Sequence, residues 1–314
     1  MPFRRARALA FAGVLVLAAC GDDAPAGPAA GPGPDAPDGS ATTGTGITNP
    51  PANPPDPSAG CGAALPKLGL LPSESITVGA AKRTYQLFVP EAYDGKKTFP
   101  IVFVFHGGGG TGAGARGTFK KLETEAAGEA IFVYPDGANK SWDLNAAPGL
   151  LANVAFIDAL AASLSTTYCS DKKRIFAVGS SEGAYFANQF ACRTKSGLRA
   201  VVTHAGGGPF GVTGTGTTFK DGQVVCPSPP VAALQVHGEN DNSVNLSEGM
   251  KSRDYYRRVN ECKDTTQPFA PSPCVAYDGC AAGRPEIWCQ VPGIGHNVWP
   301  ENGAQVTWAF LKSK

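Results

Sequence analysis

The 314-residue chain is long enough for one large domain or two small ones, and its formal net charge is +1 with only 17% charged residues. This balance excludes a nucleic-acid partner, because neutralising phosphates requires a clustered basic surface. The 40 glycines indicate many tight turns rather than a helical bundle.

Residues 1–20 predict a signal segment that is separate from the fold. Arginines at positions 4, 5 and 7 precede the apolar run "ALAFAGVLVLAA", which is too short for a comfortable membrane span and ends in small residues. Because Cys20 directly follows this run, "LAAC" resembles the lipobox of bacterial lipoproteins, and we expect Cys20 to be acylated as the new N-terminus. Ordinary cleavage near "LAA", with an incidental cysteine, is the alternative.

Residues 21–60 differ in character from the rest of the chain. They contain ten prolines, eight glycines and five aspartates, but no Lys, Arg or aromatic residue. Such a segment buries too little apolar surface to offset its ordering entropy, so we expect a disordered linker. The protein is therefore expected to be exported and either lipid-anchored at the bacterial cell envelope or secreted.

Eight cysteines remain when Cys20 is set aside, and an even number in an exported chain predicts disulfides. The sequence alone does not pair them, since eight cysteines allow 105 connectivities. A zinc site is disfavoured, because neither a C-x-x-C pair nor nearby histidines accompany the cysteines. The eight positions are 61, 169, 192, 226, 262, 274, 280 and 289.

From residue 61 to the C-terminus, strand-like and helix-like segments alternate. "ESITVG" and "KRTYQLFVP" alternate polar and apolar residues and predict antiparallel edge strands. "FPIVFVF" predicts a buried strand followed by a turn, and so do "AIFVYPDG", "RIFAVG", "AVVTHAGG", "VAALQVHG" and "EIWCQV". Helices are expected near 118–129, 149–168, 182–194, 247–261 and 302–312. This order predicts an α/β domain over 61–314, with a mostly parallel sheet, helices on both faces and ligands at the carboxyl ends of the strands.

"GSSEG" fits the pattern G-x-S-x-G in one register only, with Ser181 at its centre. The buried run "RIFAV" precedes it and the helical stretch "GAYFANQFAC" follows it, as a nucleophile elbow requires. A glycine-rich turn without catalysis is the alternative. A serine needs a histidine base that is oriented by an acid, and these follow the serine in the order acid, histidine.

His296 alone fits the position of the base, since "PGIGHNVWP" follows the last expected strand. The other histidines, at positions 106, 204 and 237, are expected to pack within turns. "HGENDNSV" offers two acids, Glu239 and Asp241, and we favour Asp241 because it stands deeper in the loop. Together these residues predict a serine hydrolase.

The oxyanion of the attacked carbonyl needs donors that are fixed in advance. We expect one to be the backbone N–H of Glu182 and the other to come from "HGGGG", at Gly107 or Gly108. A phosphate-binding loop is the alternative for the glycines, but the Lys and Ser/Thr of a P-loop are missing. The Glu182 carboxylate is expected to point elsewhere, because an acid in the first helical turn is favoured by the helix dipole.

These motifs together resemble the secreted feruloyl esterases of carbohydrate esterase family 1, which are grouped with polyhydroxybutyrate depolymerases. The resemblance runs from about residue 61 to the C-terminus and includes "YPDGANKSWDLN", "YCSDKKRIFAVGSSEG", "HGENDNSVNLSEGMKSRDYY" and "GIGHNVWP". It implies an α/β-hydrolase fold, cleavage of ferulate from plant cell-wall polysaccharide, and Ser181, Asp241 and His296 as the catalytic triad. It also implies four disulfides: Cys61–Cys169, Cys192–Cys226, Cys262–Cys280 and Cys274–Cys289.

Two departures from the family pattern bear on the substrate. Glu182 stands where such enzymes more often have an uncharged or aromatic residue, and "GHNVWP" has one residue more before its Trp-Pro than the common "GHxWP". Trp142 and Trp299 are candidates for aromatic walls of a phenolic acyl pocket, with packing near the sheet as the alternative.

The most direct prediction is an esterase that acts as a monomer and needs no cofactor, because the triad supplies nucleophile and base itself. Its membrane contact would be through the N-terminal lipid only. A polyester depolymerase or broad short-chain esterase is the alternative within the same chemistry. An inactive hydrolase fold that serves as a surface binding lipoprotein is the alternative outside it.

Overall fold

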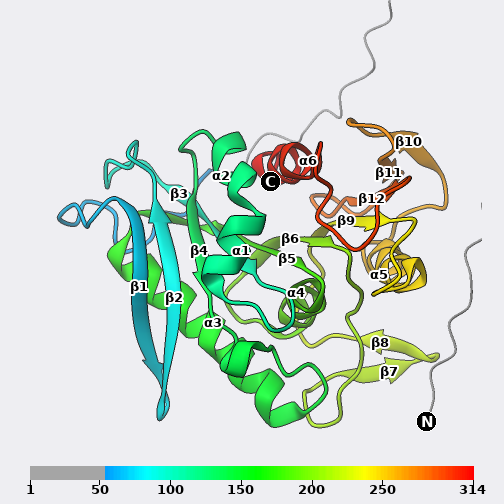
Figure 1. Ribbon diagram of the computed structural model, residues 1–314, viewed down its shortest axis with the longest axis horizontal. Helices are drawn as coiled ribbons and strands as arrows, with labels where there is room; N and C mark the ends of the chain where they lie inside the picture. The colour runs from blue at the N-terminus through cyan, green and yellow to red at the C-terminus, as the bar shows by residue number, and fades with distance from the viewer. Residues whose placement is uncertain (1–53) are drawn as a thin grey trace, which may run out of the picture. The chain divides into compact units, whose positions relative to one another are not determined.

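The computed structural model describes residues 54–314, which form a layered α/β domain (Figure 1). The predicted signal segment, the acylation of Cys20 and most of the predicted linker lie outside the described residues. The last residues of that linker, however, are fixed to the domain. Pro57 forms a β-bridge with Asp171, and the Ser58 backbone N–H donates to the Ser170 carbonyl at 2.8 Å. The prediction that the linker extends to residue 60 is therefore wrong for its last residues, which pair with the domain.

A ten-stranded sheet runs through the domain in the order β1-β2-β4-β3-β5-β6-β9-β12-β11-β10. The six strands from β4 to β12 in this order are parallel, and antiparallel pairs flank them on both sides. The strands are β1 (Gly69–Val78), β2 (Ala81–Val89), β3 (Phe99–Phe105), β4 (Ile131–Pro135), β5 (Ser170–Ser180), β6 (Leu198–His204), β9 (Ala232–Gly238), β10 (Thr266–Pro268), β11 (Val275–Tyr277) and β12 (Glu286–Val291).

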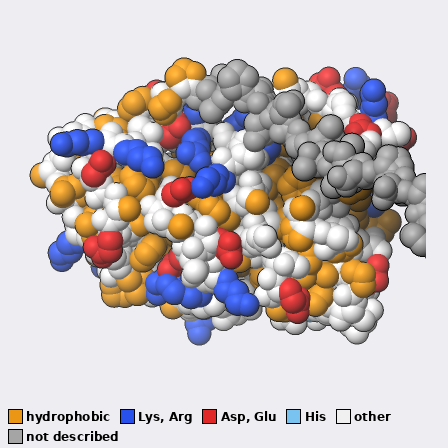
Figure 2. Space-filling view, turned by 90° about the horizontal axis from the view of Figure 1, so that it is seen from above, with side chains coloured by type: hydrophobic (Ala, Val, Ile, Leu, Met, Phe, Trp, Pro, Cys, Tyr) orange, Lys and Arg blue, Asp and Glu red, His pale blue; other side chains and the backbone are white. Residues whose placement is uncertain are grey.

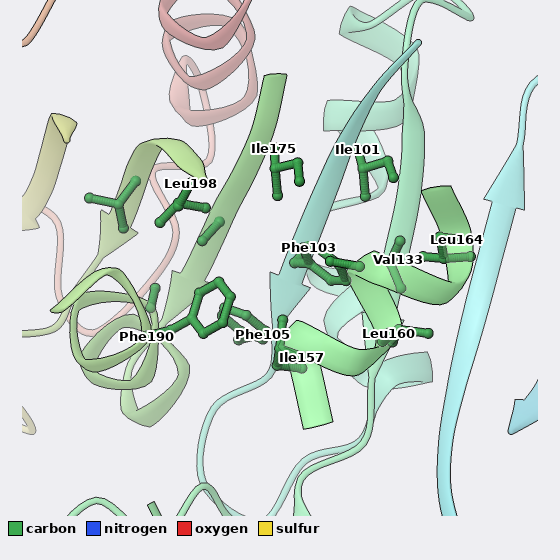
Figure 3. Packing of buried hydrophobic residues seen from close by; sticks show 14 of the residues in the cluster. Ile101, Phe103, Phe105, Val133, Ile157, Leu160, Leu164, Ile175, Phe190 and Leu198 are labelled. Atoms are coloured by element: carbon green, nitrogen blue, oxygen red, sulfur yellow. The ribbon is translucent and has the colours of Figure 1, made fainter. Parts of the chain in front are cut away.

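Helices cover both faces of the sheet, as predicted. One core lies under α3, α4 and α5 and contains Leu160, Phe190 and Tyr256, together with Phe103 and Phe105 of β3 (Figure 3). The other core lies under α1, α2 and α6. The helices are α1 (Gly112–Thr118), α2 (Lys120–Glu125), α3 (Ala147–Thr167), α4 (Glu182–Arg193), α5 (Leu246–Val259) and α6 (Gly303–Lys312), with a short 3₁₀ turn, η1 (Ala138–Lys140). The predicted fold class, a mostly parallel α/β-hydrolase sheet with helices on both faces, is confirmed.

Helix α3 is the one described helix that is long and apolar enough to span a membrane. Leu150, Phe156, Ile157 and Leu160 are each fully buried in the core. Because this face packs against the sheet and the rest of the helix is more exposed, α3 is a helix that covers the core of the domain.

One helix and four short strands were missed in the sequence. Helix α1 has the composition GAGARGT, which has a low helix propensity, and its N-terminus is capped by the Thr111 side chain, which accepts from the Gly114 N–H. The hairpin of β7 (Thr218–Lys220) and β8 (Gln223–Val225) and the outer pair of β10 and β11 consist of three-residue strands. Strands this short carry no detectable alternation.

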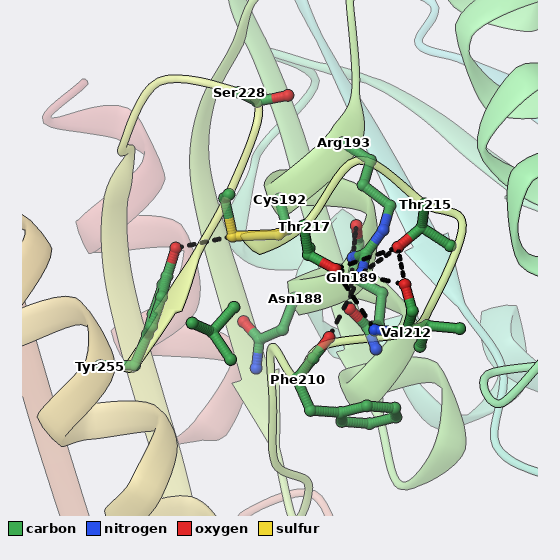
Figure 4. Close-up of a disulfide and its surroundings, with 12 residues drawn as sticks. Asn188, Gln189, Cys192, Arg193, Phe210, Val212, Thr215, Thr217, Ser228 and Tyr255 are labelled. Carbon is green, nitrogen blue, oxygen red and sulfur yellow. Dashed lines mark hydrogen bonds between the residues drawn. A yellow bond between two sulfur atoms is a disulfide. The ribbon is translucent and has the colours of Figure 1, made fainter. Parts of the chain in front are cut away.

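Four disulfides join distant parts of the chain, and they are the pairs that the family resemblance implies: Cys61–Cys169, Cys192–Cys226, Cys262–Cys280 and Cys274–Cys289. Figure 4 shows Cys192, at the end of α4, bonded to Cys226, with the Tyr255 hydroxyl donating to the Cys226 sulfur at 2.8 Å. Cys61–Cys169 attaches the N-terminal entry of the domain to the beginning of β5.

The surface carries no dominant charge on the face in Figure 2, where basic and acidic side chains are interspersed among hydrophobic ones. This distribution agrees with the formal net charge of +1.

Candidate active site

Ser181 stands on a strained turn between β5 and α4. Its backbone has φ 55° and ψ −126°, a positive φ that is rare for a residue with a side chain. A Cβ at Gly179 would lie 2.2 Å from the Gly183 carbonyl oxygen, and a Cβ at Gly183 would lie 2.4 Å from the carbonyl oxygens of Phe105 and His106. Both flanking positions therefore exclude every residue except glycine, which explains the spacing of G-x-S-x-G.

Three side chains from separate loops form one hydrogen-bonded chain. His296 Nε2 is 2.9 Å from Ser181 Oγ, and His296 Nδ1 is 2.8 Å from Asp241 Oδ2. An ionised Asp241 can only accept, so the proton lies on Nδ1 and Nε2 accepts from the serine hydroxyl. This is the arrangement in which an imidazole can act as a general base toward a serine.

The Asp241 carboxylate is fully buried but well supplied with donors. Burial raises its pKa, but hydrogen bonds from His296 and from the backbone N–H groups of Val244 and Ser243 outweigh this and leave the pKa lowered. Glu239, the other candidate acid, is exposed and accepts from the Gln290 side chain instead. The structure thus places Asp241, and not Glu239, against His296.

His237 also contacts the acid, which the sequence reasoning missed by assigning it to turn packing. Its Nε2 lies 2.9 Å from the Val244 carbonyl oxygen and 3.4 Å from Asp241 Oδ2. The Val244 carbonyl only accepts, so this nitrogen carries a proton and donates it to that carbonyl, while the Asp241 carboxylate lies beside the same nitrogen. Gly249 of α5 packs on the ring, since a Cβ there would lie 2.4 Å from His237 Nδ1.

The two remaining histidines are structural. His106 Nδ1 donates to the Gly107 carbonyl at 2.7 Å and Nε2 accepts from the Gly137 N–H at 2.9 Å, and burial lowers its pKa. His204 is completely buried, which lowers its pKa to about 3, so the ring is neutral at physiological pH. The His204 carbonyl accepts from the Ser181 N–H at 3.0 Å and thereby helps to hold the strained turn.

The expected oxyanion donors lie around the serine. A Cβ at Gly107 would be 3.3 Å from Ser181 Cβ and 3.8 Å from its Oγ, so the backbone of the glycine run passes close to Ser181. Among the described residues, the N–H groups of Gly107 and Gly108 donate no hydrogen bond. The N–H of Glu182 is in the first turn of α4, where intrahelical partners are missing.

A cavity of about 310 Å³ opens beside Ser181 and His296. Gly107 and Gly108 line one side, and Thr118, Ala205 and Val298 are among the other lining residues. It lies at the carboxyl ends of β3 and β5. These two strands form the topological switch point of the sheet, because β4 follows on one side of β3 and β5 on the other. This is the usual ligand position in open α/β sheets.

The Glu182 carboxylate does not line this cavity. Its Oε1 accepts from the Ser141 hydroxyl at 2.7 Å, and its Oε2 is buried without a partner among the described residues. A side chain at Gly108 would lie 3.5 Å from Oε2, so the carboxylate stands directly behind the glycine run. Glu182 thus links the turn at Ser181 to the segment around Ser141, and its carboxylate points away from the cavity, as predicted.

Trp142 and Trp299 do not line the cavity, so the expectation of two aromatic walls is wrong. Trp142 is fully buried and stacks on Phe186 with ring centroids 4.4 Å apart. Its indole N–H donates to the His106 carbonyl at 2.9 Å, which fixes the beginning of the glycine run. Trp299 is 5% exposed and borders a different hollow. Both indole rings pack in the hydrophobic core, which is the usual location of such large apolar side chains.

No cluster of three or more His, Cys, Asp or Glu side chains suitable for a metal occurs within residues 54–314. The acidic and imidazole groups near Ser181 are instead arranged along the hydrogen-bonded chain described above.

Comparison with known proteins agrees with this site. No protein-family model matches the chain. A probable feruloyl esterase C of Aspergillus oryzae is 30% identical over 252 residues, which cover 73% of this chain and 83% of the relative, and one of Aspergillus terreus is 28% identical over 251 residues with the same coverage. The structure of an acetyl xylan esterase from Aspergillus awamori superposes with a TM-score of 0.56 at 16% identity, covering 76% of this chain and 99% of that one. The chain therefore belongs to the feruloyl esterase C family and is a carboxylic ester hydrolase.

Proposed function

We propose that the protein is an exported serine esterase that hydrolyses feruloyl and related hydroxycinnamoyl esters of plant cell-wall polysaccharide. The observation that carries the catalytic part is the hydrogen-bonded chain from Ser181 through His296 to Asp241 beside an open cavity. The names of the relatives support the acyl group.

In the proposed mechanism, Ser181 attacks the ester carbonyl while His296 takes its proton, and Asp241 holds the imidazole in the required tautomer. The oxyanion receives hydrogen bonds from the N–H of Glu182 and of Gly107 or Gly108. His296 then protonates the leaving alcohol. Water, activated by the same histidine, attacks the acyl-enzyme and releases the acid together with free Ser181.

The proposed location outside the cytosol is supported by the four disulfides, since such bonds persist in oxidising compartments. The apolar segment that ends at Cys20 supports export and acylation of this cysteine. Mass spectrometry of the mature N-terminus tests acylation directly, because a lipidated Cys20 and an unmodified N-terminus differ in mass.

A substrate panel tests the proposed activity, with wild type, Ser181→Ala and the matched control Ser180→Ala. The panel contains methyl ferulate, 3-hydroxybutyrate oligomers and p-nitrophenyl acetate. We expect wild type and Ser180→Ala to release ferulate, whereas Ser181→Ala loses activity by several orders of magnitude. Full activity of Ser181→Ala would refute the assigned nucleophile, and hydrolysis of the oligomers without release of ferulate would refute the substrate.

A further inference from the structure

A second hollow of about 460 Å³ adjoins the cavity beside Ser181. Thr118, Asn297 and Val298 line both hollows. Since Asn297 directly follows His296, the second hollow begins next to the catalytic histidine and extends toward α2 and the beginning of α6. A substrate bound at Ser181 can therefore reach it without crossing another part of the fold.

The outer wall of this hollow is basic. Lys120 and Lys121, the first two residues of α2, are both exposed and line it together with Trp299 and Pro300. Lys121 Nζ donates to the Pro300 carbonyl at 3.0 Å, which leaves two of its N–H groups free of that bond. The ammonium group is thus held at the rim by a neutral acceptor, and its charge is not cancelled.

Glu123, the buried carboxylate of α2, is already saturated with donors. Glu123 is 3% exposed in its side chain and binds Arg116 and Lys120, while the Tyr134 hydroxyl donates to it at 2.7 Å. Among the residues that line the hollow, Lys120 and Lys121 are the charged ones. Arg116, Glu123 and the exposed Glu125 at the end of α2 are not part of the lining. Glu301, which follows Pro300, is exposed but lines neither hollow.

We propose that this hollow is a subsite for the alcohol side of the ester and that it favours an oligosaccharide bearing a uronic acid carboxylate. The inference rests on the proposed function, in which the sugar chain of the bound ester extends out of the cavity beside Ser181. An anionic sugar complements the two lysines of the lining, and the exposed ring of Pro300 suits the apolar face of a pyranose. Asn297 and Val298, which include the extra residue of "GHNVWP", form the boundary between catalytic cavity and subsite.

The experiment compares three esters of ferulic acid: methyl ferulate, a neutral feruloylated oligosaccharide, and the same oligosaccharide carrying one uronic acid. The variants are the double substitution Lys120→Gln/Lys121→Gln and the matched control Lys195→Gln, which removes a lysine from the segment beyond the end of α4. We expect the double variant to raise KM for the uronic acid substrate by about 3- to 10-fold at low ionic strength, with kcat unchanged. KM for the other two substrates should change less than about 2-fold, and 0.5 M salt should abolish the difference.

The outcomes separate the subsite from the proposed function. If methyl ferulate is cleaved but the double variant treats both oligosaccharides alike, the subsite is overturned and the esterase assignment stands. If wild type cleaves none of the three esters, the proposed function fails and the subsite falls with it. A similar loss in Lys195→Gln would also overturn the subsite, since charge at a distance would then explain the effect.

Discussion

Glu286, the first residue of β12, should make the protein less stable as the pH rises. Its side chain is completely buried and neither carboxyl oxygen has a hydrogen-bond partner within residues 54–314. Burial raises its pKa well above the ordinary value of 4.5, and nearby Arg253, which lowers the pKa, is itself paired with Asp254. The folded state therefore holds the acid in its neutral form.

The sign and size of the effect follow from linkage. Below pH 4.5 the carboxyl is neutral in both the folded and the unfolded chain, so its contribution to stability is fully present. Above that pH the unfolded chain releases the proton and the folded chain retains it, which costs up to about 1.4 kcal/mol per pH unit until the folded pKa is reached. From pH 5 to pH 7 this amounts to about 2.7 kcal/mol at most, a large share of a typical unfolding free energy.

Urea unfolding followed by tryptophan fluorescence between pH 5 and pH 8 measures this contribution. We expect Glu286→Gln to gain stability relative to wild type as the pH rises, because glutamine has no proton to lose. The matched control is Glu239→Gln, which alters an exposed carboxylate and should leave the pH dependence unchanged. Parallel curves for wild type and Glu286→Gln would refute the reasoning.

Three further predictions concern the site and its support. His237→Phe should lower kcat about 10-fold and change the pH profile, because it removes the N–H that binds the Val244 carbonyl beside Asp241, a loss of about 1.4 kcal/mol. His237→Gln should restore part of the rate. Equal activity of wild type and both variants would contradict a role for His237 in positioning Asp241. Glu182→Gln should raise kcat about 5-fold, because it removes a negative charge behind the expected oxyanion donors but keeps an acceptor for the Ser141 hydroxyl. An unchanged kcat would show that this charge does not affect the reaction. Replacing Cys61 and Cys169 by alanine should lower the unfolding free energy by about 4.8 kcal/mol, the loop-closure entropy expected for a sequence separation of 108 residues. Calorimetry measures this loss, and a loss below about 1 kcal/mol would contradict the chain-entropy account.

Much of the fold could be predicted from the sequence because the central strands are continuous apolar runs that end in glycine or histidine. "RIFAVGSSEG" contains both the buried strand and the only spacing of glycines that permits the turn at Ser181. Local pattern and tertiary structure agree there, since the strained turn lies at Ser181, where the glycine spacing predicts it.

The rest depends on contacts that no local pattern encodes. His237 packs beside Asp241 because Gly249 of α5, the next helix along the chain, leaves room for the ring. Trp142 was expected in the acyl pocket, but stacking on Phe186 places it in the core. The two partners lie 12 and 44 residues further along the chain, in other elements of the fold, and residue type alone did not indicate either contact.

The disulfide at the beginning of β5 determines how a mechanical load would travel through the molecule. A pull on the N-terminal segment reaches Cys61 and passes directly to Cys169, so the 107 residues between them form a covalent loop that bears no tension. The bridge between Pro57 and Asp171 and the bond from Ser58 to Ser170 direct the same force to the same strand end. β5 then carries the load along its length to Ser181. If the chain is tethered at its N-terminus while its substrate is part of a solid wall, β5, which directly precedes Ser181, transmits the force between the tether and the bound substrate.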